Sequence, residues 1–130
     1  MLNPSTADEH LDDPTIRRCI GFATSWGCTE LNVVNLFALR ATDPKALKNH
    51  PDPVGPRNDA ILAEYIEFHT IHDGIIVAAW GANKLAKARA ASLAPLFANA
   101  RCLALNRDGS PKHPLYCRAD LVPAPLDLRP

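Results

Sequence analysis

The sequence predicts a three-layer α/β fold, in which a short parallel sheet is flanked by helices. Short apolar runs rich in β-branched residues alternate along the chain with segments whose apolar residues recur at helical spacing. The chain has 130 residues, of which 47% are hydrophobic and 22% are charged, an ordinary composition for a soluble globular protein. We therefore expect one domain over residues 1–130 with one hydrophobic core.

The first half of the chain is expected to form two helices with a strand between them. The sequence DDP at residues 12–14 is typical of a helix start, and Gly27 would end that helix. Residues 31–38 (LNVVNLFA) form a short apolar run, which is typical of a strand buried on both faces. Residues 43–44 (DP) open a short helix, and the prolines of residues 50–56 indicate a loop.

The second half repeats the alternation of helix and strand. A helix is expected over residues 58–72, with Asn58 as its cap, and a strand over residues 74–80 (GIIVAAW). An alanine-rich helix over residues 82–100 and a strand over residues 101–106 follow. The remaining residues are rich in proline and are expected to run over the surface. The predicted apolar stripe of the helix before Gly74 comprises Ile61, Leu62, Tyr65, Ile66 and His69.

The candidate site begins with the polar segment of residues 3–6 (NPST). The amide of Asn3 can both donate and accept hydrogen bonds, so it can orient a water molecule or read the edge of a base. Ser5 and Thr6 can bind a phosphate group. Since asparagine, proline and serine also favour turns, a simple turn is the competing interpretation.

Three further candidates lie on the first predicted helix, inside the first predicted strand and at the carboxyl end of that strand, where parallel sheets bind ligands. Arg17 could reach a phosphate or carboxylate through its planar guanidinium. Asn35 lies inside an apolar run and needs a hydrogen-bonding partner there. Arg40 follows that run, and it either binds a ligand or forms a salt bridge with an acid such as Asp43.

Two later segments complete the candidate site. Trp80 can stack on a flat ring or belong to the core, and Lys84 lies at a predicted helix N-terminus, which favours an anion. His113 lies in the proline-rich C-terminal part of the chain. A neutral imidazole there could donate a hydrogen bond to a developing oxyanion.

Composition and motifs argue against several other classes of function. Fourteen basic residues balance fourteen acidic ones, so tight non-specific binding of nucleic acid is not expected. The four cysteines contain no Cys-x-x-Cys pair and are expected to be reduced thiols in the cytoplasm. His69 and His72 have no evident third ligand, so no metal site is expected. The common hydrolase and nucleotide-binding motifs are missing, no cofactor is expected, and no apolar run approaches the roughly 20 residues of a membrane span.

Five segments together carry a family resemblance: MLNPSTAD, DDPTIRRCIGFATSWG, VVNLFALRATDP, VAAWGA and HPLY. They resemble a bacterial and phage family of uncharacterised proteins, the domain-of-unknown-function family 1643. The resemblance covers nearly the whole chain. Members of that family usually start earlier, with strands that lead into the Leu-Asn-Pro-Ser segment. The resemblance therefore implies that the N-terminal strand is lacking here, through truncation, or that another segment fills its place.

The order of an Asn-Pro segment, a Trp-Gly pair and a late His-Pro segment is also distantly similar to the uracil-DNA glycosylase superfamily. This resemblance implies a uracil-DNA-glycosylase-like fold and hydrolysis of an N-glycosidic bond. It also implies that Asn3 positions a water and that His113 donates to the carbonyl of the base. The late segment departs from the glycosylase pattern, because it reads His-Pro-Leu-Tyr in place of His-Pro-Ser-Pro.

Three functional interpretations stay open. In the first interpretation, the chain is an enzyme that acts on a nucleobase, nucleotide or nucleic acid, with Asn3 and His113 as catalytic residues. Alternatively, it is a non-catalytic nucleotide-binding module, with Arg40 or Lys84 on a phosphate. The third interpretation is a truncated, inactive family member, whose exposed sheet edge would pair two chains into a homodimer. No membrane partner is expected under any of the three.

Overall fold

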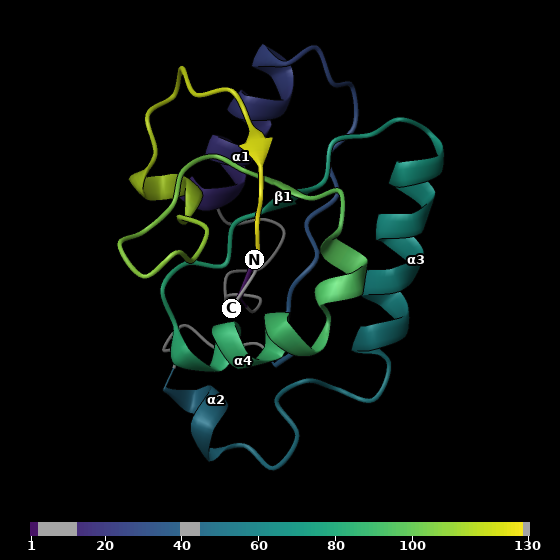
Figure 1. Cartoon of the computed structure of the whole chain (residues 1–130), viewed down its shortest axis with the longest axis vertical. Coiled ribbons are helices and arrows are strands. Elements are labelled where there is room, and N and C mark those ends of the chain that lie inside the picture. Colours follow the sequence, from purple (N-terminus) through teal and green to yellow (C-terminus); the bar gives the residue numbers. More distant parts are fainter. Residues whose placement is uncertain (3–12, 40–44, 129–130) are drawn as a thin grey trace.

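The structure is a computed structural model that describes residues 1–2, 13–39 and 45–128. Helices surround a short open sheet of three strands, so the predicted α/β class is confirmed. In chain order the elements are α1 (Pro14–Ser25), α2 (Ala46–Asn49), α3 (Asn58–Ile71), β1 (Val77–Ala78), α4 (Lys84–Ser92), η1 (Ala94–Phe97), β2 (Arg101–Cys102), η2 (Pro114–Tyr116) and β3 (Ala124–Pro125). Figure 1 shows α1 and α3 on opposite sides of the strands.

The sheet is mixed, with the strand order β1-β2-β3. β1 and β2 are parallel, whereas β3 is antiparallel to β2. The prediction of a parallel sheet is therefore confirmed for β1 and β2 and wrong for β3, which lies in the proline-rich segment expected on the surface. Pro125 has no N–H to donate, which suits the edge position of this strand. The opposed residues are Val77 and Arg101, Ala78 and Cys102, Arg101 and Pro125, and Cys102 and Ala124.

Residues 31–38 (LNVVNLFA), which were predicted as a strand, do not form a regular strand. The second half of this segment nevertheless runs beside the N-terminus. The Leu36 N–H donates to the Met1 carbonyl at 2.9 Å, and the Met1 ammonium donates to the Val34 carbonyl at 3.2 Å. The Phe37 N–H donates to the Leu2 carbonyl at 2.9 Å. Leu36 and Phe37 are both buried. The apolar pattern thus predicted burial correctly for these two residues, whereas Leu31 and Ala38 are exposed. The described pairing is also too short for a regular ladder.

α1 begins and ends where the sequence predicts. The Asp13 carboxylate accepts hydrogen bonds from the N–H groups of Thr15, at 2.8 Å, and Ile16, at 3.4 Å. The first residue of the helix is a proline, whose fixed φ suits that position. Gly27 has a φ of +78°, which lets the chain turn away after the last helical turn.

α3 covers the predicted range, but two details differ. Asn58, expected to be the cap, is the first residue of the helix, and its side chain bonds to another segment. Of the predicted apolar stripe only Leu62 is fully buried, whereas Ile61 and Tyr65 are 41% and 40% exposed. The outer part of this helix is therefore more apolar than a solvent-facing helix needs to be.

α4 is shorter than the helix predicted over residues 82–100. It begins at Lys84, and the side chain of Asn83 accepts the first free N–H groups at 2.8 and 3.3 Å. It ends at Ser92, and the 3-10 turn η1 follows. Pro95 explains the break, because it lacks an N–H and its ring clashes with a preceding carbonyl in a continuous helix.

The main hydrophobic core lies where the sheet, α4 and the segment after Asn35 meet. A smaller cluster of Phe22, Leu103 and Cys117 packs beside α1. A three-layer fold like that of the uracil-DNA glycosylases is not confirmed by this short mixed sheet. The buried members of the main core include Leu36, Phe37, Leu47, Ala78, Trp80, Ala86, Ala90, Phe97, Ala100, Cys102 and Leu126.

Candidate functional site

Four of the predicted site residues, Asn3, Ser5, Thr6 and Arg40, lie outside the described residues. The other five can be placed. His113 is half-buried, and Trp80 is buried. Arg17 lies on α1, and Lys84 is the first residue of α4. Asn35 lies directly before the buried Leu36.

His113 caps the short turn η2 with its own ring. Its Nδ1 accepts a hydrogen bond from the Leu115 N–H at 3.2 Å. A ring nitrogen that accepts carries no proton, so the neutral imidazole has its proton on Nε2. His113 therefore presents Nε2–H as a hydrogen-bond donor.

The imidazole of His113 is neutral at pH 7. Burial lowers its pKa, the positive charge of the Met1 ammonium lowers it further, and the Asp13 carboxylate raises it. Desolvation disfavours the charged form of histidine, and its ordinary pKa of 6.5 already lies below neutrality. Because the charge of Met1 affects this pKa, the ring and the N-terminus lie within electrostatic reach of one another.

The loop after β1 meets His113. Gly81 donates its N–H to the Pro111 carbonyl at 2.9 Å, and a Cβ added to Gly81 would lie 3.8 Å from the Cβ of His113. Gly81 has a φ of +83°, a conformation that other residues rarely adopt. The structure thus brings together Gly81 of the Trp-Gly pair and His113 of the His-Pro segment, both predicted from the sequence to belong to one candidate site.

Tyr116 is the aromatic residue beside His113. Its ring centroid lies 5.9 Å from that of the imidazole, and the side chain is 77% exposed. Trp80, by contrast, is only 5% exposed and packs against Phe97 with their centroids 5.3 Å apart. Of the two rings, Tyr116 is therefore the one that can stack on a ligand from solvent.

The remaining placed residues have structural neighbours of their own. The side chains of Arg17 and Lys84 are exposed to solvent. The backbone carbonyl of Asn35 accepts a hydrogen bond from the Asn58 side chain at 2.9 Å. α1 packs against η2, so Arg17 lies on the helix that flanks the His113 segment.

Two residues that anchor this region were missed in the sequence. The Leu36 carbonyl accepts hydrogen bonds from Asn58 Nδ2, at 2.8 Å, and from Arg89 Nε, at 3.0 Å. Arg89 also forms an ion pair with Asp59. An asparagine after a proline-rich loop reads as a helix cap, and no signal in the sequence reveals which distant carbonyl it reaches.

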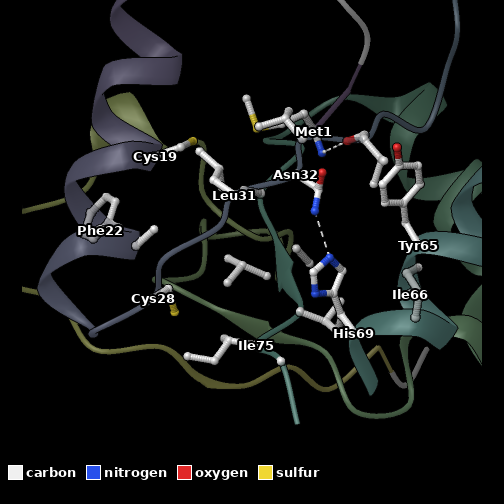
Figure 2. Close-up of a pocket in the computed structure, with 18 of the residues that line it drawn as sticks. Met1, Cys19, Phe22, Cys28, Leu31, Asn32, Tyr65, Ile66, His69 and Ile75 are labelled. Carbon is white, nitrogen blue, oxygen red and sulfur yellow. Dashed lines mark hydrogen bonds between the residues drawn. The ribbon is translucent and has the colours of Figure 1, made fainter. Parts of the chain in front are cut away.

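A cavity of about 540 Å³ lies between α1 and α3. Figure 2 shows Cys19 and Phe22 of α1 on one side and Tyr65, Ile66 and His69 of α3 on the other. Trp80 also lines it, and His113 is not among its lining residues.

All four cysteines are free thiols. Burial raises the pKa values of Cys19, Cys102 and Cys117, so these side chains are protonated at neutral pH. Protonated thiols are poor nucleophiles and poor metal ligands. Within the described ranges no three His, Cys, Asp or Glu side chains are grouped to hold a metal ion, and none of the described helices is long and apolar enough to cross a membrane.

A family model described as "Protein of unknown function (DUF1643)" matches residues 1–115. The family resemblance carried by the sequence motifs is thereby confirmed. No curated protein and no solved structure matches the chain. The more distant resemblance to the uracil-DNA glycosylases therefore gains no support from these comparisons.

Proposed function

The chain belongs to the DUF1643 family of proteins of unknown function, and we propose that it binds a nucleobase and hydrolyses the N-glycosidic bond that holds the base. One observation carries this proposal. His113 is half-buried and neutral, and its Nδ1 is already occupied by the Leu115 N–H, which leaves Nε2–H as the ring donor that we propose for a ligand acceptor.

A donor of this kind suits the departure of a base. When water attacks the sugar C1′, the C1′–N bond breaks and the electron pair leaves with the base. Negative charge then develops on a carbonyl oxygen of the base, where a fixed N–H donor stabilises the transition state. The hydroxyl of the water remains on C1′, and its proton finally reaches the departed base.

Asn3 is the residue that we propose to orient the attacking water. It follows Leu2, whose carbonyl accepts the Phe37 N–H at 2.9 Å. The Met1 charge lowers the pKa of His113, which supports a short separation between the Met1 amine and the imidazole. An asparagine amide can hold a water through its oxygen while donating through its nitrogen.

Tyr116 is the residue that we propose to stack on the base. It is exposed beside His113, whereas Trp80 is buried against Phe97. The balanced charge of the chain, with fourteen basic and fourteen acidic residues, favours a nucleoside, nucleotide or single strand over duplex DNA. Lys84 and Arg17, both exposed, are proposed to bind phosphate groups of such a substrate.

The experiment that tests this proposal measures free base. The protein is incubated with uracil-containing single-stranded DNA, the matching duplex and uridine, and released uracil is quantified by chromatography. We expect release from the single strand or the nucleoside, and loss of release in Asn3→Ala. The control is Glu67→Gln, a change on the exposed surface of α3.

Binding without release would identify a different function. If uridine binds but no substrate loses its base, the chain is a non-catalytic binding module that uses the same loops. If neither binding nor release occurs, the proposal is wrong in both parts, and the inactive family member remains.

A further inference from the structure

We propose a second binding site, which goes beyond the proposed function: the cavity between α1 and α3 binds an uncharged, flat and largely apolar ring system that carries one N–H donor. The cavity measures about 540 Å³, within the roughly 300–1,000 Å³ range typical of ligand sites. Met1, Trp80 and Pro114 line the cavity, whereas His113 and Tyr116 do not, so variants of His113 and Tyr116 test the proposed nucleobase site without altering a wall of the cavity.

The walls of the cavity are mostly apolar. Phe22, Ala23 and Trp26 line it from α1, and Ile66 lines it from α3. Val77 of β1 contributes to the wall between them. Burial of an apolar ring against these side chains is favourable because it removes the ring from water, and the side chains themselves offer no hydrogen-bonding partners to a polar group.

The lining also explains why the ligand should be uncharged. Among the described residues that line the cavity, Glu30 is the one whose side chain is an acid, and none is a Lys or Arg. Glu30 is already engaged, since its carboxylate accepts from Asn32 Nδ2 at 3.0 Å. The Met1 ammonium donates to the Val34 carbonyl. A phosphate or carboxylate in the cavity would therefore lack a free cation to pair with.

A polar cluster of Glu30, Asn32 and His69 in the lining favours a ligand with an N–H donor. Asn32 Nδ2 lies 3.0 Å from the Glu30 carboxylate and 2.9 Å from His69 Nε2 (Figure 2). The carboxylate can only accept, which identifies the nitrogen of the amide and uses one of its two hydrogens. The second hydrogen points to His69 Nε2. Asn32 Oδ1 is then the atom of this side chain that can accept a hydrogen bond from a ligand.

Indole and indene are the matched probes for this site. The two molecules have nearly the same shape, but indene lacks the N–H group. We expect indole to shift the backbone amide resonances of cavity residues in a saturable titration, and to bind about fivefold more tightly than indene, the effect of one net hydrogen bond. Equal affinities would contradict the role of Asn32, and no saturable shift with indole would overturn the site itself.

Variants separate the walls from the polar cluster. Ala23→Leu fills part of the cavity and should weaken both probes by tenfold or more, with Cys19→Leu as a second filling variant if the first does not fold. Asn32→Leu should remove the preference for indole while retaining indene binding. Glu64→Gln, on the exposed surface of α3, is the control that leaves both affinities unchanged. Indole binding that survives both filling variants would place the probe elsewhere and overturn the proposal.

Discussion

At the scale of single residues, the hydrogen bond from the Leu115 N–H to His113 Nδ1 decides what this imidazole can do. It fixes the proton of the neutral ring on Nε2, and burial keeps the ring neutral by lowering its pKa. A histidine that donates from Nε2 at pH 7 can stabilise negative charge on a departing group, whereas it cannot accept a proton at the same atom.

The stability of the protein should fall as the pH is lowered through the titration of His113. The unfolded histidine, with its ordinary pKa of 6.5, binds a proton before the folded one does, because burial lowers the folded pKa. The free energy of unfolding therefore falls between pH 6.5 and the lower folded pKa and then levels off. Urea unfolding from about pH 8 to about pH 5 measures this slope.

The Met1 amine contributes to the same slope, so a control is needed. Burial lowers its pKa from 8.0 to about 6, which reduces stability as the pH falls through that window. His113→Asn keeps an acceptor for the Leu115 N–H but does not titrate. This variant should lose the histidine share of the slope and retain the amine share, and an unchanged slope would contradict the assigned pKa shift.

Tyr116 gives a prediction about binding alone. Its side chain is 77% exposed, so Tyr116→Ala should leave the melting temperature nearly unchanged. The same variant should weaken the binding of uridine by about tenfold, because stacking on an aromatic ring is lost. Tyr116→Phe keeps the ring and should bind as the unaltered protein does, whereas equal affinity in the alanine variant would remove Tyr116 from the site.

The residue types at the site could be proposed from the sequence, but their surroundings could not. His113 stood out because imidazole chemistry operates near neutral pH. Its role as a cap depends on the local turn of η2, which has no clear sequence signal. Trp80 ends an apolar run, a pattern compatible with a stacking platform or with the core, and only its packing against Phe97 distinguishes them.

At the scale of elements, side chains from α3 and α4 hold the backbone of Asn35 and Leu36 in place. The Asn58 amide is 7% exposed and donates to the carbonyls of Asn35 and Leu36 at 2.9 and 2.8 Å. Arg89 of α4 donates to the second of these carbonyls at 3.0 Å. This segment also holds Met1 and Leu2 by backbone hydrogen bonds, so the anchors act on the N-terminal part of the proposed site.

Asn58→Ala should therefore destabilise the protein by about 2–3 kcal/mol, since it removes one buried and one partly buried hydrogen bond and leaves the Leu36 carbonyl with Arg89 as its described side-chain donor. Urea denaturation monitored by circular dichroism measures this loss. Asn49→Ala, at the exposed end of α2, is the matched control and should change stability by less than about 0.5 kcal/mol. A loss in Asn58→Ala no larger than in the control would show that the amide is not an anchor.

α1, which has local start and stop signals, was predicted well, whereas strands, which depend on distant partners, were not. The strands predicted over residues 74–80 and 101–106 contain only the two-residue strands β1 and β2. The Asp13 cap and the following proline define α1 within a few residues. The backbone hydrogen bonds of residues 34–37 depend on Met1 and Leu2, which lie more than thirty positions away. β3 contains a proline and reads as a loop, and only its pairing with β2 makes it a strand.

At the scale of the whole molecule, opposite charges cancel. The sequence contains fourteen Lys and Arg residues and fourteen Asp and Glu residues. A protein that neutralises about 6–10 phosphates loses roughly 10³–10⁵ in affinity between about 50 and 200 mM salt. A chain without excess positive charge should contact far fewer phosphates.

Binding of single-stranded DNA should accordingly depend only weakly on salt. We expect the dissociation constant to rise by less than about tenfold over the same salt range, measured by fluorescence anisotropy with a labelled oligonucleotide. A steep dependence would instead indicate a local basic surface that dominates binding and would favour a nucleic-acid polymer over a nucleoside as the ligand.

The overall class could also be read from the sequence, because the alternation of apolar runs and helical segments reports burial without reference to partners. The mixed sheet and the cavity between α1 and α3 could not, since both depend on how the elements pack. An apolar stripe says which face of a helix is buried but not against what, and exposed Ile61 and Tyr65 of α3 illustrate that limit.

The most direct test of the proposed function compares two substitutions of His113 in the release of uracil. In His113→Asn the amide oxygen replaces Nδ1 as the cap of η2 but no donor occupies the Nε2 position, whereas His113→Gln restores a donor near that position. We expect His113→Asn to lower the rate of release by about 10²–10³-fold with its fold intact, and His113→Gln to retain part of the activity. Release at the unaltered rate by His113→Asn would show that the imidazole donor has no part in the reaction.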